Sequence, residues 1–521
     1  GLLVTMAATA LAVALVPASP VLGHEERALV FPPGPGSVPK YSIKGPLLVV
    51  CKKSSKARIE KLPKRVRERN LELLRKCKRD GYRSIQSAIN HVTKKGSRIK
   101  ILPGRYRERK TLAKPMAKGC AELQDTAVLT YEEQVKCPTL QNIITVFGDS
   151  DDEDIVCDEP VCDLQIEGTG ARPGDVVLDG DWKRLNVLRA DRADGIYLRN
   201  FTAQRAPFNA VYILQTDGFV IDELVGRWNY EYGFLTFASD HGLYKNCEAY
   251  LNGDGGLYPG SAAPHQGVEP SIEIRRCKSH HNTLGYSGTA GNSTYVHHNK
   301  FYKNTLGVVT DSFFPDHPGL PQNSARFVHN KIYSNNKDYY KNYTNGKCDK
   351  PFEEMGIEEG TVCPAVPVPI GVGLLIAGGN HNIVGENHIY DNWRYGTMQF
   401  WVPAALREEH DPDKQYDTSN YNRYIGNVMG SSPAGKMLPN GLDFWWDEEG
   451  AGNCWEINDG GEDGITSDPE ELPDCTGNPV FSPGDSAKQA FLVPCATWSR
   501  EDHHPEGCDW MEKPEKPEQP E

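Results

Sequence analysis

Side chains that could carry out acid–base chemistry are concentrated between residues 254 and 317. They are Asp254, Tyr258, His265, Arg275, Tyr286, Asp311, Asp316 and His317. Carboxylates can hold a metal ion or a substrate, histidine or arginine can take up a proton, and tyrosine can donate one. The sequence therefore predicts a site in this stretch at which one proton is removed and another is supplied.

The elements that must position these residues repeat along the chain. The segment NKFYKN at residues 299–304 recurs as NKIYSN at 330–335 and as NHIYDN at 387–392. Asn282 and Asn304 open two further segments that are alike, Asn-Thr-Leu-Gly in both cases. A period of 20 to 50 residues indicates a stacked array of similar units.

Each unit holds short apolar or alternating segments, such as residues 196–198 and 272–274, which have the length of strands. No unit has room for a helix of ten or more residues, which excludes the helical solenoids. A coil of about 22 or 23 residues made of short strands predicts a parallel β-helix, with coils about 4.8 Å apart. Repeated Asn side chains at the corners would then stack as an amide ladder, and Asp194, Asp217 and Asp240 would lie in one row.

The start of the array has a signature of its own. Residues 82–90 (YRSIQSAIN) predict a short helix, and residues 99–106 (IKILPGRY) predict the strand that it feeds. This pair resembles the first segment of secreted β-helix proteins, and the chain is similar over roughly residues 80–430 to the right-handed parallel β-helix superfamily, which includes pectate lyases and uronan epimerases. The resemblance implies an all-β, right-handed, single-stranded parallel β-helix with a helical cap at its N-terminal end.

Composition suggests how the rest of the chain is organised. The expected parts are a signal peptide (1–23), a basic segment with a cap helix (24–79), the β-helix (80–430), a Cys/Trp-rich C-terminal cap (431–511) and a disordered Lys-Pro-Glu tail (512–521). The signal peptide rests on the apolar run at residues 2–16, which is followed by Pro-Ala-Ser-Pro. We expect a secreted, extracellular monomer without a transmembrane span.

Charge is distributed unevenly, because residues 40–110 contain 24 Lys or Arg and only 5 Asp or Glu, whereas the whole chain has a formal charge of −13. Residues 57–78 place leucines among these basic residues and predict an amphipathic helix over the first coil. The basic residues could meet an acidic polymer. A solvated cap helix is the simpler interpretation, and we favour it.

Fourteen cysteines in an exported chain predict disulfides between sequence neighbours. The expected pairs are Cys51–Cys77, Cys120–Cys137, Cys157–Cys162, Cys247–Cys277, Cys348–Cys363, Cys454–Cys475 and Cys495–Cys508. For Cys247 and Cys277, which occupy equivalent places in adjacent coils, two stacked thiols remain an alternative to a disulfide.

The loops at residues 258–270 and 312–323 are longer than a regular coil needs, and insertions on one face of a repeat protein tend to carry function. The first holds His265, and the second holds Asp316 and His317. A third insertion, residues 337–369, could wall the same groove. We expect a polysaccharide, most simply an acidic one, to lie along this groove.

The superfamily resemblance implies two reactions. In β-elimination from a uronate, His317, His265 or Arg275 would act as the base and Tyr286 as the acid, while Asp254 and Asp311 would hold metal or substrate. In hydrolysis, two carboxylates would flank the bond, Asp311 with Asp254 or Asp316. Asp254, Asp316 and Tyr258 are the predicted substrate-binding residues.

The sequence leaves the reaction open, because it lacks the Trp-Ile-Asp-His block of pectate lyases, the Asp-Pro-His-Glu block of mannuronan epimerases and the paired-Asp signature of polygalacturonases. Residues 314–318 (FPDHP) share only an Asp beside a His with the epimerase block. The alternative is a non-catalytic exported β-helix that binds envelope glycans or serves as a maturation factor. No nucleic-acid partner and no metal ligand is assigned. Calcium is the cofactor considered, for the acidic loop at residues 149–158, although a solvated loop is favoured there.

Overall fold

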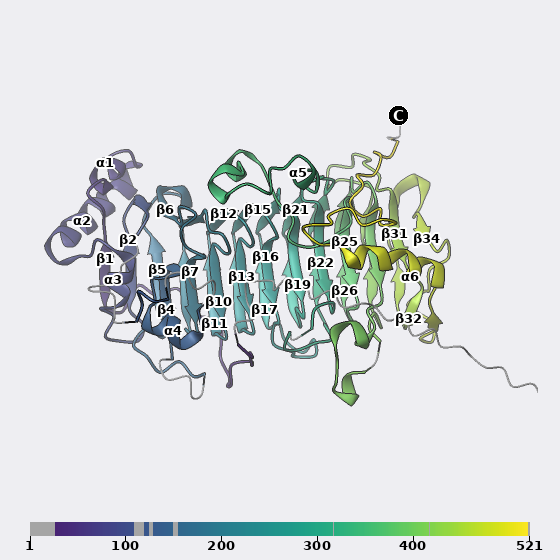
Figure 1. The fold of residues 1–521 in the computed structure, drawn as a ribbon, viewed down its shortest axis with the longest axis horizontal. Coiled ribbons are helices and arrows are strands. Elements are labelled where there is room, and N and C mark those ends of the chain that lie inside the picture. Colours follow the sequence, from purple (N-terminus) through teal and green to yellow (C-terminus); the bar gives the residue numbers. More distant parts are fainter. Residues whose placement is uncertain are drawn as a thin grey trace, which may run out of the picture.

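The computed structural model describes residues 27–108, 119–123, 129–149, 155–315, 317–415 and 417–518. Within them the chain winds into successive coils, and the strands of these coils stack into three long parallel sheets of 12, 10 and 11 strands, here called sheets A, B and C (Figure 1). The predicted all-β parallel β-helix is confirmed. The predicted signal peptide lies outside the described residues.

Sheet A consists of β1 (Leu47–Val50), β2 (Arg98–Ile101), β5 (Gln165–Gly168), β8 (Ile196–Arg199), β11 (Asp217–Asp222), β14 (Asp240–Lys245), β17 (Ile272–Arg275), β20 (Thr294–His297), β23 (Arg326–Val328), β26 (Ile383–Gly385), β29 (Arg423–Ile425) and β33 (Cys454–Glu456). Sheet B consists of β3 (Gly104–Tyr106), β6 (Val176–Asp179), β9 (Thr202–Gln204), β12 (Val225–Asn229), β15 (Glu248–Asn252), β18 (Lys278–His280), β21 (Lys300–Tyr302), β24 (Lys331–Tyr333), β27 (His388–Tyr390) and β30 (Val428–Met429). Sheet C consists of β4 (Asn142–Phe147), β7 (Asn186–Asp191), β10 (Val211–Leu214), β13 (Phe234–Phe237), β16 (Gly255–Gly260), β19 (Leu284–Thr289), β22 (Leu306–Asp311), β25 (Val372–Ala377), β28 (Tyr395–Phe400), β31 (Leu442–Trp446) and β34 (Ser467–Asp468).

The remaining elements lie at the ends and in the insertions. They are α1 (Ser55–Ile59), α2 (Lys64–Asp80), α3 (Ile85–Ile89), α4 (Tyr131–Lys136), α5 (Lys341–Thr344), α6 (Ser486–Leu492), seven short 3-10 turns that include η7 (Val493–Thr497), and the antiparallel pair β32 (Glu449–Ala451) and β35 (Phe481–Pro483).

The corners of the coils are held by the repeated asparagines. The backbone N–H of Asn282 donates to Asn304 Oδ1 at 3.0 Å, and the backbone N–H of Asn304 donates to Asn335 Oδ1 at 3.2 Å. A second ladder runs through Asn299 and Asn330 in the same way, at 3.0 Å. Each amide thereby satisfies a buried backbone donor of the neighbouring coil, which the helix corner would otherwise leave without a partner. The predicted amide ladder is confirmed.

The aspartate row follows the same stacking. Asp217 pairs with Asp240 in the register of β11 and β14, and the backbone N–H of Asp217 donates to Asp194 Oδ1 at 2.8 Å. The row carries two histidines, because His241 Nδ1 lies 2.6 Å from Asp217 Oδ1 and His265 Nε2 lies 2.9 Å from Asp240.

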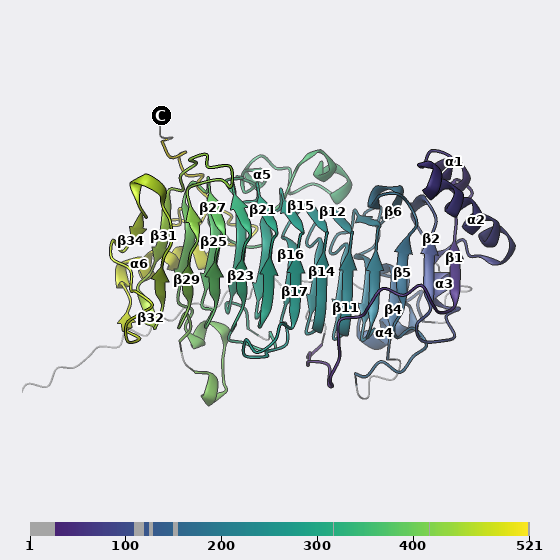
Figure 2. The ribbon, with the colours of Figure 1, turned by 180° about the vertical axis from the view of Figure 1, so that it is seen from behind.

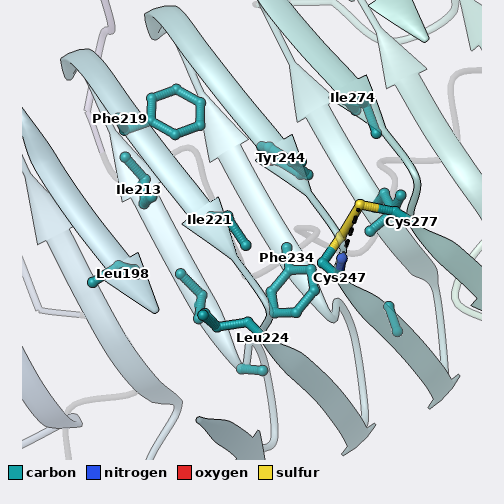
Figure 3. Close-up of a cluster of buried hydrophobic side chains, with 14 of the residues drawn as sticks. Leu198, Ile213, Phe219, Ile221, Leu224, Phe234, Tyr244, Cys247, Ile274 and Cys277 are labelled. Atoms are coloured by element: carbon teal, nitrogen blue, oxygen red, sulfur yellow. Dashed lines mark hydrogen bonds between the residues drawn. A yellow bond between two sulfur atoms is a disulfide. The ribbon is translucent and has the colours of Figure 1, made fainter. Parts of the chain in front are cut away.

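The core fills the interior between the three sheets with alternate side chains of every coil. Figure 3 shows one section of it, in which Tyr244 packs against Phe219 and Phe234 and the disulfide of Cys247 and Cys277 lies in the same interior. These two cysteines form a disulfide between adjacent coils, which settles the alternative left by the sequence. All seven predicted disulfides are present.

The helical cap sits over the first coil, as predicted. The helix expected over residues 57–78 is two helices, because Pro63 stands between α1 and α2 and takes the N-cap position of α2. Proline cannot donate a backbone hydrogen bond, so it fits a helix start and interrupts a longer one. No helix in the described part of the chain is long and apolar enough to cross a membrane.

The stacked strands extend beyond the predicted range of 80–430 at both ends. β1 precedes the cap helices, and β31, β33 and β34 follow residue 430. The final coils were missed because their spacing differs: the amide ladder continues from Asn427 to Asn458, but these two residues are 31 positions apart, whereas Asn282 and Asn304 are 22 apart.

The two terminal segments lie against the outside of the solenoid. Figure 2 shows the N-terminal segment passing along sheet A, where the Tyr41 hydroxyl donates to Glu167 Oε2 at 2.9 Å. The C-terminal segment with α6 crosses the outer face of sheet C, as Figure 1 shows in yellow. Cys495, Trp510 and Met511 of this segment are buried there against sheet C residues such as Met398.

Candidate functional site

Most of the predicted site residues lie on strands of sheet C or on the loops that leave it. Asp254 immediately precedes β16, Tyr258 lies within β16, and Asp311 ends β22. The hydroxyl of Tyr232 donates to Asp254 Oδ2 at 2.8 Å, and the Tyr232 ring packs against the ring of Tyr258 at a centroid distance of 4.8 Å. Tyr232, which the sequence analysis did not single out, therefore joins Asp254 to Tyr258.

His317 reaches the same cluster from the loop at residues 312–323. Its Nδ1 lies 3.1 Å from the carbonyl oxygen of Pro315, which can only accept, so Nδ1 carries the proton. In the neutral ring Nε2 then accepts from the hydroxyl of Tyr258, at 3.2 Å. The ring of His317 also packs edge-on against Phe237. The structure thus brings Asp254, Tyr258 and His317 together, as the sequence predicts.

The carboxyl of Asp254 is strongly perturbed. Burial, together with the nearby charges of Glu231 and Asp311, raises its pKa to about 8, against the hydrogen bond from Tyr232 and the charge of Arg500. Its Oδ1 is buried and has no hydrogen-bond partner among the described residues, and the same is true of Glu231 Oε2. Burial also raises the pKa of Glu231, while Arg500, 3.2 Å from Glu231 Oε1, opposes that rise. Asp254 is therefore protonated at neutral pH.

Asp311 is perturbed less. Burial raises its pKa to about 6, against hydrogen bonds from the Phe313 backbone and the Thr289 hydroxyl, the latter at 2.9 Å. Two carboxyls whose surroundings hold their pKa values apart on either side of neutrality are suited to the roles of general acid and general base.

The other predicted residues lie elsewhere. Tyr286 points into the core of the solenoid, where its hydroxyl lies 3.1 Å from Thr294 Oγ1. Arg275 ends β17 of sheet A and pairs with Glu273 at 3.0 Å. His265 pairs with Asp240 at the start of β14. Asp316 lies outside the described residues.

The outer face of sheet C is covered. Asp254, Tyr258, Asp311 and His317 are each at most 6% exposed. Leu29 of the N-terminal segment packs against the cluster of buried side chains that contains Tyr232 and Tyr258. Over Glu231 lie Arg500 and the insertion at residues 337–369, which itself packs on Trp498. The insertions therefore fold back onto the sheet instead of walling an open groove, because their aromatic side chains gain more by burial than by exposure.

Sheet B, in contrast, has an outer face that is half open to solvent and rich in aromatic rings. Tyr250, His280, Tyr302, Tyr333 and Tyr390 stand on five successive coils with ring centroids 4.8–5.1 Å apart and nearly parallel planes. Because each ring face is occupied by the next ring, the ladder offers its edges and hydroxyl groups to a ligand.

A row of basic side chains runs beside this ladder. Lys278, Lys300, Lys331 and His388 pair in register across β18, β21, β24 and β27, and alternate with the aromatic residues along each strand. Lys300 and Lys331 form no ion pair with any residue in the described part of the chain. Adjacent strands lie about 4.8 Å apart, so Lys278, Lys300 and Lys331 place one ammonium on each of three successive coils, and the first of these also lies 4.0 Å from Glu248.

The sequence contained the signal for this face. The repeated segments read Lys-Phe-Tyr, Lys-Ile-Tyr and His-Ile-Tyr at residues 300–302, 331–333 and 388–390. In a strand the first and third residues point to the same side. The sequence analysis used these repeats only to find the corners, and so missed the surface that they form.

The residues that the structure describes form no candidate metal site. No group of three or more His, Cys, Asp or Glu side chains among the described residues could hold a metal ion. Of the acidic loop at residues 149–158, residues 150–154 lie outside the described residues, and Asp149 pairs with Arg192 at 2.8 Å.

Comparison with known proteins bears on the fold. The family model described as "Right handed beta helix region" matches residues 209–348, which include Asp254, Tyr258, Asp311 and His317 and the aromatic ladder as far as Tyr333. The chain is a right-handed parallel β-helix protein. No curated protein sequence matches it.

Several solved structures are similar to this β-helix protein at low identity. The pectate lyase Pel9A is 11% identical, with 67% of this chain and 70% of that chain covered and a TM-score of 0.34. The A-module of the mannuronan C-5 epimerase AlgE4 from Azotobacter vinelandii is 12% identical, with 72% and 90% covered and a TM-score of 0.38. The Dettilon tailspike protein is 10% identical, with 72% and 57% covered and a TM-score of 0.41. Likenesses this distant say nothing about the activity of this β-helix protein.

Proposed function

We propose that the protein binds an acidic polysaccharide along the outer face of sheet B. The observation that carries this proposal is the lysine row beside the aromatic ladder, in which Lys300 and Lys331 have no ion-pair partner among the described residues. A polymer with regularly spaced anionic groups would meet a cation at each coil, and the tyrosine hydroxyls would hydrogen-bond its oxygens.

Electrostatic contacts at an exposed surface are individually weak, at about 0–1 kcal/mol each, and are screened by salt. A row of several such contacts, repeated along a polymer that bridges them, gives useful affinity through effective concentration. We therefore expect binding that depends on polymer length and falls as salt concentration rises. The seven disulfides suit an oxidising compartment, so the polysaccharide would be extracellular.

The test is a titration of the protein with a polyuronate and with a neutral polysaccharide. The double variant Lys300→Glu/Lys331→Glu should bind the polyuronate at least tenfold more weakly, because it turns two attractive contacts into repulsive ones. The matched control, Lys61→Glu/Lys94→Glu, changes the net charge equally at two exposed lysines near the N-terminal end of the solenoid and should bind as the wild type does. The proposal would be refuted if all three proteins bound the polyuronate with equal affinity, or if the wild type bound the neutral polysaccharide as tightly as the polyuronate.

A second candidate function is cleavage of such a polymer by elimination or hydrolysis, with Asp254 as the acid and Asp311 as the base. The observation that favours it is the pair of separated carboxyl pKa values, about 8 and about 6. His317 and Tyr258 would assist through their hydrogen bond. Since these residues are buried, this activity requires that the covering segments move. Release of unsaturated or reducing ends by the wild type, lost in Asp311→Asn and in His317→Ala, would support it. Equal release by both variants would remove these residues from the mechanism.

A further inference from the structure

The insertion at residues 337–369, which begins four residues after Tyr333 of the aromatic ladder, forms a basic pocket. The pocket has a volume of about 520 Å³. The insertion that forms it includes α5, which is labelled at the top of Figure 1. Five lysines line it, four from the insertion and one from the C-terminal segment: Lys337, Lys341, Lys347, Lys350 and Lys513. Three carboxylates also line it, namely Asp338, Glu354 and Glu359.

The pocket carries a surplus of positive charge, because five lysines face three carboxylates. None of the five lysines forms an ion pair with a residue that the structure describes. The ammonium of Lys513 lies over the ring of Trp393 at 4.7 Å. Partial burial of the Lys337 ammonium lowers its pKa, and the charges of Lys303, Lys513 and Lys341 lower it further. Like charges held this close repel one another, and a bound anion would relieve that repulsion.

The lysines stand on a fixed frame. The backbone N–H of Lys337 donates to the carbonyl of Asn304 at 3.0 Å, and the hydroxyl of Thr305 donates to the carbonyl of Lys337 at 2.7 Å. The insertion is closed by the disulfide between Cys348 and Cys363. A frame of this kind lowers the entropy lost when a ligand is bound.

The residue types indicate which anion fits. The pocket lining contains five lysines and no arginine. Arginine presents a planar fork that binds a carboxylate or a phosphate through two oxygens, whereas lysine is a compact point charge that can approach an anion from any direction. Five such charges around one pocket suit a tetrahedral anion, which offers oxygens in several directions at once. We propose that this pocket binds a sulfate or phosphate group carried on a glycan. The glycan part of this inference rests on the proposed function, whereas the tetrahedral anion site does not.

The experiment measures binding of inorganic sulfate, inorganic phosphate, a sulfated oligosaccharide and its unsulfated parent by calorimetry at constant ionic strength. The wild type should bind both inorganic anions, and should bind the sulfated oligosaccharide more tightly than its parent. The variant Lys337→Ala/Lys341→Ala should weaken each of these interactions at least tenfold. The side chains of both lysines are exposed, so the fold should be kept, and an unchanged thermal midpoint checks this.

The matched control is Lys61→Ala/Lys94→Ala, which removes two exposed lysines near the N-terminal end of the solenoid and should bind as the wild type does. Binding that is unchanged in the pocket variant, or absent for both inorganic anions, would overturn the inference, and the polyuronate titration would still decide the proposed function separately. Inorganic anions that bind while neither oligosaccharide does would support the tetrahedral anion site and overturn its glycan part.

Discussion

Replacing Asp254 with asparagine should change how the stability of the protein depends on pH. The pKa of Asp254 is about 8 in the folded protein, and about 3.9 is expected for an aspartate in an unfolded chain. The folded protein therefore holds this proton more tightly. The resulting stabilisation is complete below about pH 4 and is lost as pH rises through about 8.

The size of the effect follows from the two pKa values. Each pH unit between them costs the wild type about 1.4 kcal/mol of unfolding free energy. Between pH 5 and pH 7 the wild type should lose about 2.5 kcal/mol through this one carboxyl. Asp254→Asn does not titrate and should lose none of it. Asparagine keeps the shape of the side chain, and its amide oxygen can still accept the hydrogen bond from Tyr232.

The assay is guanidinium unfolding of both proteins at pH 5, 6 and 7, with the disulfides intact and tryptophan fluorescence as the probe. As pH rises from 5 to 7, the unfolding free energy of the variant should increase by about 2.5 kcal/mol relative to that of the wild type. Asp413→Asn, at an exposed position, serves as the control and should follow the wild type. If Asp254→Asn and the wild type keep a constant difference from pH 5 to pH 7, Asp254 does not hold the proton and cannot be the acid.

Three other changes test the architecture. Cys247→Ala/Cys277→Ala opens a loop of 30 residues and should lower the free energy of unfolding by roughly 3–4 kcal/mol. The thermal midpoint of the variant should be lower than that of the wild type, and adding a reducing agent should lower it by less than it lowers the wild-type midpoint. Asn304→Ala removes the oxygen that accepts from the Asn282 backbone and should cost about 1–3 kcal/mol; an unchanged unfolding midpoint would show that the ladder contributes nothing. Arg500→Ala leaves Glu231 buried without its cation and should cost about 3–5 kcal/mol, with a loss that grows as pH rises above the pKa of Glu231; a loss independent of pH would contradict the ion pair.

The fold could be predicted because its cause is local and repeats. Asn282, Asn304 and Asn335 each make the same corner, so their spacing shows the coil length directly. The disulfides could be paired for a related reason, since sequence neighbours on adjacent coils or in one loop are also neighbours in space. The last coils keep the corner asparagines, but Asn427 and Asn458 are 31 residues apart instead of 22, and so these coils could not be found from the period.

The site could be predicted only in part. Residues on one strand face, such as Tyr258, follow from the period, and the pairing of His317 with Tyr258 agrees with the expectation that the loop returns to that face. The direction of Tyr286 does not follow, because a shift of one residue along a strand moves a side chain from the surface to the core. The covering of sheet C by Arg500 and Leu29 depends on contacts across most of the chain, which no local pattern encodes.

The most direct test of the proposed binding face is to couple a bound polyuronate to the protein with a carbodiimide and to locate the coupled lysines by mass spectrometry. A carbodiimide joins a carboxylate to an amine that lies against it, so it marks the lysines that the polymer contacts. The account predicts coupling at Lys278, Lys300 and Lys331, suppressed by high salt. Coupling confined to the basic segment at residues 40–110, with these three lysines unmodified, would contradict it.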